Sequence, residues 1–279
     1  MKKETLHPVW RETESCRGIF LPEWEENGVK SLFTSRVGGV SGGPYTSLNL
    51  GLHHAADDRE TVCRNRKILA DAMNISVEKM VCCQQVHGIR VARVAAADGG
   101  RGAMDMETVI ADTDALITNE EDVYLTLVFA DCVPLFFFDP QVRAIGLAHG
   151  GWKGTWGQIA AAVIRAMEDS FGSRAQDIQC WIGPGIDVCC FEIGDDLAEK
   201  VASREGWSRF LSRRENGRIT WDLKQTHRHI LLENGILPEH IAVSEECTCC
   251  CEQDFFSYRR DHGRTGRMAA VLGLEQRKK

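Results

Sequence analysis

Residues 123–149 read VYLTLVFADCVPLFFFDPQVRAIGLAH. This segment contains three short apolar runs, 123–130, 133–138 and 143–148, which are rich in β-branched and aromatic residues and are interrupted by proline and polar residues. Runs of this length and composition are typical of buried β-strands. We therefore predict that they form the central sheet of an α/β protein.

The rest of the chain supplies further strands and helices around this sheet. Short β-rich runs predict additional strands at 29–34, 80–86, 90–95, 114–118, 178–183, 241–245 and 267–272. Apolar residues spaced three and four apart predict helices at about 58–74, from Gly154 to Gly172, at about 195–204 and at about 222–234. No fixed-period repeat and no Pro/Ser-rich linker divides the chain, so we expect a single domain over residues 1–279.

Composition and charge exclude several classes of function. The formal net charge is −7 and the pI is near 5.8, so the chain lacks the basic character of a nucleic-acid-binding protein. The longest strongly apolar stretch, 123–138, is broken by Asp131 and Pro134 and is shorter than the roughly 20 residues of a membrane span. The segment from Met1 to Pro8 lacks the apolar core of a signal peptide. We therefore expect a cytoplasmic protein that binds neither nucleic acid nor membranes.

Three segments place a metal-binding side chain at a strand end beside small residues. They are centred on His87, Cys132 and His149. Two imidazoles and one thiolate suit zinc, and catalytic zinc sites commonly use three protein ligands and keep one position open. The spacing of the three residues matches no local zinc motif. A buried free cysteine and two histidines bonded to backbone carbonyls are the alternative interpretation.

Four arginines are candidates for binding an anionic substrate. Arg36 lies in the glycine-rich segment 35–44, which forms either an anion-binding nest or a flexible hairpin. Arg66 lies near the apolar face of the first predicted helix, where an inward arginine is usually paired with an anion or a carboxylate. Arg259 and Arg260 are candidates for the same role, with solvated salt bridges as the alternative.

Aromatic residues and cysteines leave further alternatives open. Trp152 and Phe256 either stack on a purine base or pack in the core. The chain has twelve cysteines and no visible export signal, which favours reduced thiols or metal ligands over disulfides. Adjacent thiols in the segment 247–251 cannot all reach one tetrahedral ion, and Cys189-Cys190 would point to opposite faces of a strand. We therefore interpret these cysteines mainly as packing residues, with a structural zinc site as the less favoured alternative.

Six motifs of this sequence, taken together, resemble the YfiH/YlmD family. They are Ser35–Gly51, Gln84–Gly88, Ala130–Cys132, His149–Gly154, Ile182–Ile186 and Phe255–Asp261. The motifs follow the family's order over nearly the whole chain. Members have been called multicopper polyphenol oxidases, or laccases, and later purine nucleoside phosphorylases. Two departures from the family pattern are Gly150, where many members have alanine, and the richer cysteine segment.

The resemblance implies a CNF1/YfiH-like α/β fold with central mixed β-sheets flanked by helices. It also implies one zinc ion bound by His87, Cys132 and His149, which would form the catalytic centre. The implied activity is phosphorolysis of adenosine, inosine and methylthioadenosine by inorganic phosphate, with some adenosine deamination. Arg66, and either Arg259 or Arg260, are similar to family residues expected to contact phosphate or substrate.

Two other enzyme functions remain open from the sequence. In a Cys/His hydrolase that edits peptidoglycan precursors, Cys132 would be the nucleophile and His149 or His87 its base. A copper-dependent laccase ranks third, because such enzymes need many histidines in His-x-His pairs and the chain has nine histidines in all. A closed structural metal site without catalysis has the lowest rank. The sequence also leaves open whether the chain forms a homodimer.

Overall fold

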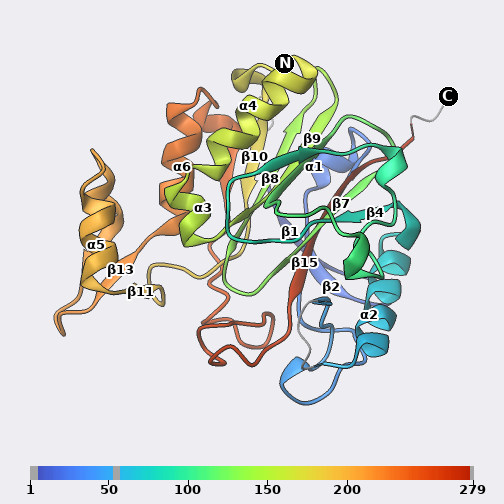
Figure 1. Cartoon of the computed structure of the whole chain (residues 1–279), viewed down its shortest axis with the longest axis horizontal. Helices are drawn as coiled ribbons and strands as arrows, with labels where there is room; N and C mark the ends of the chain where they lie inside the picture. The colour runs from blue at the N-terminus through green and yellow to red at the C-terminus, as the bar shows by residue number, and fades with distance from the viewer. Residues whose placement is uncertain (1–5, 53–56, 277–279) are drawn as a thin grey trace.

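The computed structural model describes residues 6–52 and 57–276, so part of the N-terminal segment considered above lies outside the described residues. Two six-stranded sheets pack face to face and carry helices on their outer faces (Figure 1). Both sheets mix parallel and antiparallel pairs, which confirms the predicted fold class. None of the helices in the described part of the chain is long and apolar enough to span a membrane.

The strands fall into three sheets. In spatial order, the first sheet contains β1 (Val9–Glu12), β2 (Arg17–Phe20), β3 (Val29–Thr34), β15 (Met268–Leu274), β7 (Tyr124–Phe129) and β4 (Met80–Cys82). The second contains β14 (Ile241–Val243), β10 (Gln179–Ile182), β8 (Val133–Asp139), β9 (Ala144–Gly150), β6 (Ala115–Thr118) and β5 (Val91–Arg93). A small third sheet contains β11 (Glu192–Ile193), β13 (Ile219–Trp221) and β12 (Leu211–Arg213).

Six α-helices lie in the described residues, and most of them flank the two large sheets. They are α1 (Pro22–Glu25), α2 (Arg59–Ala72), α3 (Trp152–Trp156), α4 (Ile159–Phe171), α5 (Asp195–Ala202) and α6 (Leu223–Glu233). Helix α2 covers the first sheet, whereas α4 and α6 cover the opposite side of the molecule (Figure 1). Asp58 caps α2 by accepting a hydrogen bond from the backbone N–H of Thr61, as expected for a short carboxylate before a helix.

Strand β8 shows why its sequence is apolar at nearly every position. Leu135 and Phe137 pack with α4 on one face, whereas Phe136 and Phe138 pack between the two sheets on the other. Side chains alternate between the two faces of a strand. A strand that is covered on both faces therefore needs apolar residues at its odd and at its even positions. All four side chains are at most 2% exposed.

The structure corrects the prediction that the three central runs form one sheet. Strand β7 belongs to the first sheet, whereas β8 and β9 belong to the second. The chain therefore crosses between the sheets at residues 130–132. Asp131 adopts a left-handed backbone conformation, with φ of 85°, at this crossover.

Other differences from the sequence predictions have local causes. The helix expected from Gly154 to Gly172 is divided into α3 and α4, because Gln158 between them adopts a left-handed conformation with φ of 64°. The strand expected at 80–86 ends at Cys82, since the chain turns there into the loop that carries His87. The small third sheet was not predicted.

The burial of Phe137 on β8 leads to a testable prediction. Replacing Phe137 by alanine should lower the free energy of unfolding by about 3–5 kcal/mol, because the ring is fully buried and the cavity would not refill. Urea denaturation measures this loss. The matched control is Leu237→Ala, whose side chain is 38% exposed and whose effect should stay within about 0.5 kcal/mol. Equal effects of the two substitutions would contradict the assignment of β8 to the core.

Candidate metal centre and adjoining pocket

The structure brings together His87, Cys132 and His149, which are far apart in the sequence. Their ligand atoms all lie within 4.8 Å of one another. His87 lies in the loop after β4, Cys132 at the crossover between β7 and β8, and His149 near the end of β9. A Cβ at Gly151 would lie 2.9 Å from Cδ2 of His87 and 3.0 Å from Sγ of Cys132, so glycine leaves room for both ligands.

A buried carboxylate, Asp114, joins two of these ligand segments. Its Oδ1 lies 3.0 Å from Nδ1 of His149. It also accepts hydrogen bonds from the backbone N–H groups of Val86, His87 and Gly88, at 3.2, 2.9 and 2.7 Å. A hydrogen bond at Nδ1 leaves Nε2 of His149 as the metal-binding nitrogen, as in carboxylate–histidine–zinc sites.

The charges at this centre favour the metal-binding form of Cys132. Burial raises the pKa of the Cys132 thiol, but the charge of His149 and hydrogen bonds from both histidines outweigh burial and lower this pKa to about 6. Burial lowers the pKa of His149, but Cys132 and Asp114 outweigh burial and raise it to about 9. The two shifts belong to one thiolate–imidazolium pair, in which a metal ion would take the place of the proton on His149. Metals bind the thiolate, so the donor set fits a zinc ion.

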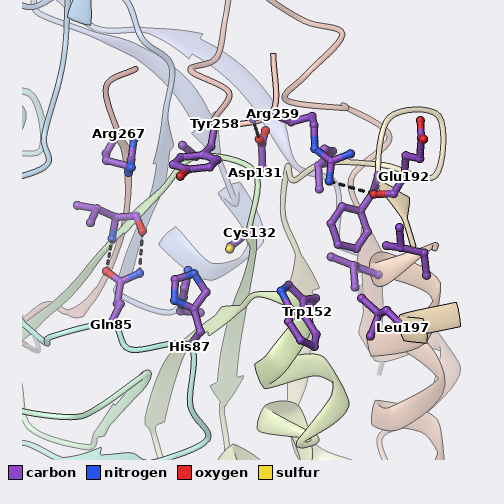
Figure 2. A pocket seen from close by; sticks show the side chains of 17 residues that line it. Gln85, His87, Asp131, Cys132, Trp152, Glu192, Leu197, Tyr258, Arg259 and Arg267 are labelled. Atoms are coloured by element: carbon purple, nitrogen blue, oxygen red, sulfur yellow. Dashed lines mark hydrogen bonds between the residues drawn. The ribbon is translucent and has the colours of Figure 1, made fainter. Parts of the chain in front are cut away.

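A cavity of about 660 Å³ opens beside the three ligands. Figure 2 shows His87 and Cys132 on one side of it and Trp152 and Leu197 on another. Its apolar wall consists of Trp152, Ile186, Phe191, Ile193, Leu197 and Leu223. Its polar wall contains Gln85, Asp131, Glu192, Tyr258, Arg259 and Arg267. A pocket that is mostly apolar with a few convergent polar groups is the usual form of a small-molecule site.

Asp131 positions the arginine side of the pocket. Its carboxylate accepts hydrogen bonds from the hydroxyls of Thr248 and Ser257, at 2.7 and 3.0 Å, and from the backbone N–H of Arg259, at 2.7 Å. The crossover that carries Cys132 is therefore tied to the C-terminal loop. This contact fixes Arg259 at the pocket, where its guanidinium also donates to the backbone carbonyl of Glu192.

The other predicted arginines have different positions. Arg66 is buried and donates to the backbone carbonyls of Leu50, Gly102 and Ala103, and it is not among the pocket-lining residues of the described chain. Its inward direction therefore serves loop packing. Arg260 does not line this pocket either.

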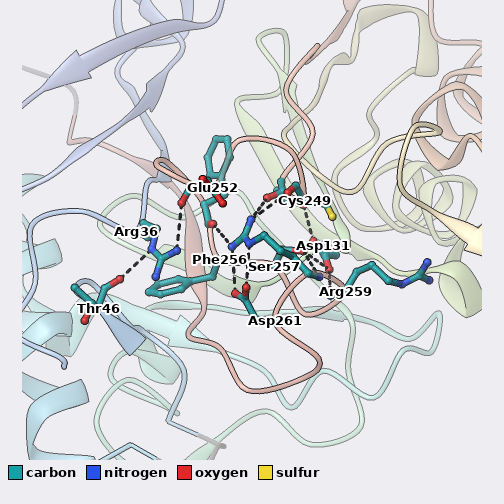
Figure 3. Close-up of polar contacts among 12 residues, drawn as sticks. Arg36, Thr46, Asp131, Cys249, Glu252, Phe256, Ser257, Arg259 and Asp261 are labelled. Atoms are coloured by element: carbon teal, nitrogen blue, oxygen red, sulfur yellow. Dashed lines mark hydrogen bonds and ion pairs between the residues drawn. The ribbon is translucent and has the colours of Figure 1, made fainter. Parts of the chain in front are cut away.

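Arg36 and Arg260 line a second hollow. Figure 3 shows Arg36 bonded to Thr46 and Glu252 beside the ring of Phe256. The guanidinium carbon of Arg36 lies 4.5 Å from the ring centroid of Phe256, and Arg260 forms an ion pair with Asp261. Phe256 is fully buried, so it packs in the core, whereas Trp152 lines the main pocket. Of the two aromatic candidates, only Trp152 is in contact with that pocket.

Sequence reasoning missed Asp114 and Arg267. Asp114 is fully buried at the first position of a predicted strand, and a buried carboxylate needs partners, but its place in the sequence does not reveal which ones. Arg267 precedes β15 and is 7% exposed. Burial lowers the pKa of Arg267, and the charges of Cys132 and Asp131 oppose this shift, which reflects how close the guanidinium lies to the metal centre.

Comparisons with known proteins agree with this architecture. Residues 30–275 match the model of a family described as multi-copper polyphenol oxidoreductase laccase. The chain belongs to this laccase-named family.

Two relatives of this chain are named as phosphorylases and not as laccases. A protein from Geobacillus stearothermophilus, named purine nucleoside phosphorylase YlmD, is 42% identical over 251 residues, or 89% of this chain and 91% of the relative. A Bacillus subtilis protein of the same name is 37% identical over 279 residues, or 98% of this chain and 99% of the relative. The crystal structure of YlmD from Geobacillus stearothermophilus has a TM-score of 0.91 at 37% identity, and the match covers 97% of this chain and 100% of that one.

The role of Asp114 in this family member is testable. Asp114→Asn should weaken zinc binding about 10- to 100-fold, because an amide cannot accept all four hydrogen bonds of the carboxylate and so loosens both histidines. Competition with a chromogenic chelator measures the affinity. The control is Asp112→Asn, two residues away and exposed, which should leave zinc affinity unchanged. If both variants bind zinc as the wild type does, Asp114 does not position the ligands.

Proposed function

We propose that the chain is a zinc-dependent purine nucleoside phosphorylase. It would convert adenosine, inosine and S-methyl-5′-thioadenosine to the free base and the ribose 1-phosphate or methylthioribose 1-phosphate. The observation that carries this proposal is the convergence of three zinc-type ligands beside a cavity of about 660 Å³ that also contains two arginines and an aromatic wall. The names of the relatives support the same activity.

The pocket contains groups that suit each part of the substrates. Arg259 and Arg267 are cationic groups that would bind inorganic phosphate, since guanidinium groups hold phosphate by paired hydrogen bonds. Phe191 and Trp152 would contact the purine ring. Zinc held by His87, Cys132 and His149 would supply a fixed positive charge at one end of the pocket.

The reaction needs little covalent chemistry from the protein. A phosphate oxygen forms a bond to C1′ of the ribose while the bond from C1′ to N9 of the purine breaks, and the leaving base takes up a proton. Positive charge develops on the ribose as that bond breaks. The arginines would hold the phosphate dianion close to this charge, so positioning and electrostatics would supply most of the acceleration.

We also propose adenosine deamination as a side activity of this pocket. Water would replace phosphate as the attacking group and would add at C6 of the purine, and ammonia would leave to give inosine. The same residues would orient the nucleoside for both reactions, so the two activities should share their dependence on the metal ligands.

The proposed activity predicts a strict dependence on phosphate and on Cys132. The purified chain should release ribose 1-phosphate from adenosine only when inorganic phosphate is added. Cys132→Ala should lose both zinc from this centre and at least about 100-fold in kcat/KM, because a metal ligand is removed. Product chromatography and metal analysis are the measurements.

Cys63→Ala is the control for this experiment, since Cys63 is a partly buried thiol that bonds to the backbone carbonyl of Met104 away from the pocket. It should keep both zinc and activity. Wild-type protein that carries zinc but yields no ribose 1-phosphate at saturating phosphate would exclude the proposed function.

Substituting Arg259 and Arg260 one at a time tests which of these two neighbouring residues binds phosphate. Arg259→Gln should raise the KM for phosphate about 10- to 100-fold, since a charged hydrogen bond in a pocket contributes roughly 1.5–3 kcal/mol. Arg260→Gln should leave that KM within about twofold and lower thermal stability, because Arg260 donates to the backbone carbonyls of Thr248, Cys249 and Phe255. Steady-state kinetics and thermal melts distinguish the two. The opposite pattern would assign phosphate binding to Arg260.

One observation favours a second candidate, a Cys/His hydrolase. The lowered pKa of Cys132 beside His149 is also what a nucleophilic thiolate requires. One thiolate cannot bind zinc and act as a free nucleophile. Rapid alkylation of Cys132 in protein as purified, together with an absence of zinc, would favour the hydrolase.

The positions of the histidines give little support to a copper-dependent laccase activity. The sequence contains one His-x-His pair, His227 and His229, both on α6. Residues two apart on a helix do not face each other. Nε2 of His227 lies 2.9 Å from the hydroxyl of Thr155, whereas His229 pairs with Glu233. The two imidazoles therefore cannot share a copper ion.

A further inference from the structure

Four cysteines outside the pocket lie together, contrary to the expectation that they serve as separate packing residues. The Sγ atoms of Cys189, Cys190, Cys247 and Cys250 are all within 4.8 Å of one another. Cys189 and Cys190 lie in a turn, where adjacent side chains need not point to opposite sides as they would in a strand. Cys189 and Cys190 therefore provide the second thiol pair that a tetrahedral site with Cys247 and Cys250 requires.

The sheet topology explains why these two segments meet. Strand β10 pairs with β14 in parallel, so the loops that follow the two strands leave the sheet at the same end. A parallel bridge between Gly185 and Cys247 continues this pairing, and the backbone N–H of Thr248 donates to the carbonyl of Gly185. The backbone thus fixes the two cysteine pairs against each other.

The distances between the sulfur atoms fit one tetrahedral ion. Sγ of Cys250 lies 3.5 Å from that of Cys189 and 3.3 Å from that of Cys190. Sulfur atoms bound to zinc at about 2.3 Å are roughly 3.8 Å apart in a tetrahedron. A disulfide needs about 2.05 Å. In addition, Cys247 and Cys250 have the C-x-x-C spacing that is common in structural zinc sites.

Hydrogen-bond donors and cationic side chains surround the cluster. The backbone N–H of Asp187 donates to Sγ of Cys247 at 3.4 Å. Arg214 and Arg259 donate to the backbone carbonyls of Cys189 and Cys190. These cationic side chains would offset the negative charge of a site with four thiolates.

Packing alone does not explain the cluster. Cys189 and Cys250 are exposed, so bringing their thiols together buries little apolar surface. Exposed thiols at this distance are also prone to oxidation unless they are bound. Four ligands from the protein leave no open position, which is the arrangement of a structural zinc site rather than a catalytic one.

We propose that Cys189, Cys190, Cys247 and Cys250 bind a structural zinc ion, separate from the centre formed by His87, Cys132 and His149. This ion joins the loop after β10 to the loop after β14. The first loop continues into Phe191 and Glu192, which line the pocket. The second zinc ion therefore holds one wall of the pocket in place without contacting the substrate.

Zinc stoichiometry tests this proposal. The full chain, expressed and purified under reducing conditions, should contain two zinc ions per chain by mass spectrometry of the metal. Cys250→Ser and Cys132→Ala should each contain one, and the double variant none. Cys251→Ser is the matched control, because Cys251 lies in the same segment but outside the cluster of four, and this variant should keep both ions.

X-ray absorption of zinc in Cys132→Ala tests the ligands without changing the cluster, so the test holds even if Cys250→Ser fails to fold. The expected result is four sulfur neighbours at about 2.3 Å. Wild type with a single zinc and Cys132→Ala with none would overturn the proposal. A disulfide between the two pairs in freshly purified protein, or iron at the cluster, would also overturn it. Phosphorolysis assays play no part in these outcomes, so the proposal stands or falls independently of the enzyme activity.

Discussion

The candidate metal centre depends on one buried carboxylate. Asp114 accepts hydrogen bonds from three successive backbone N–H groups of the loop that carries His87, and from the ring of His149. His87 has a left-handed backbone conformation, with φ of 62°, which is rare outside glycine and needs such support. Without this acceptor, three partly buried amide groups would lose their partner within the protein. The same group therefore stabilises the loop and orients two candidate metal ligands.

Strand register then places the remaining groups at the same end of both sheets. Residues at this end are joined by the pairs Val133–Gly150, Ala115–Ala148 and Phe129–Met268. Asp114, Cys132 and His149 are consequently neighbours although they lie at or beside the ends of three different strands, β6, β8 and β9, and Arg267 directly precedes β15. The crossover at Asp131 is essential to this geometry, because it moves the chain from one sheet to the other at the point where the ligand Cys132 occurs. The position of the pocket thus follows from the topology of the two sheets.

The sequence reveals the ligands more readily than their supports. His87, Cys132 and His149 are candidate ligands because metal-binding side chains lie beside small residues at strand ends and because the six motifs resemble the YfiH/YlmD family. Asp114 has no such pattern, since its four partners become adjacent only after β6 and the loop before it are packed. Arg66 shows the converse: an inward arginine is visible from the helix period, but only the folded loops show that carbonyl groups bind it. Short apolar runs likewise predict strands but do not say which sheet each strand joins.

Charge pairing around the pocket determines which substrates it can favour. The carboxylates of Asp114 and Asp131 are turned toward protein donors, and Glu192 pairs with Arg218 through its Oε2. The acidic groups near the cavity are therefore bonded to neighbouring donors, and Arg259 and Arg267 place guanidinium groups on its wall. An anion is favoured beside these arginines, and the apolar side chains of the wall favour an uncharged planar group. We infer that this division, rather than the metal alone, would select the pair of phosphate and purine nucleoside over a phenolic substrate.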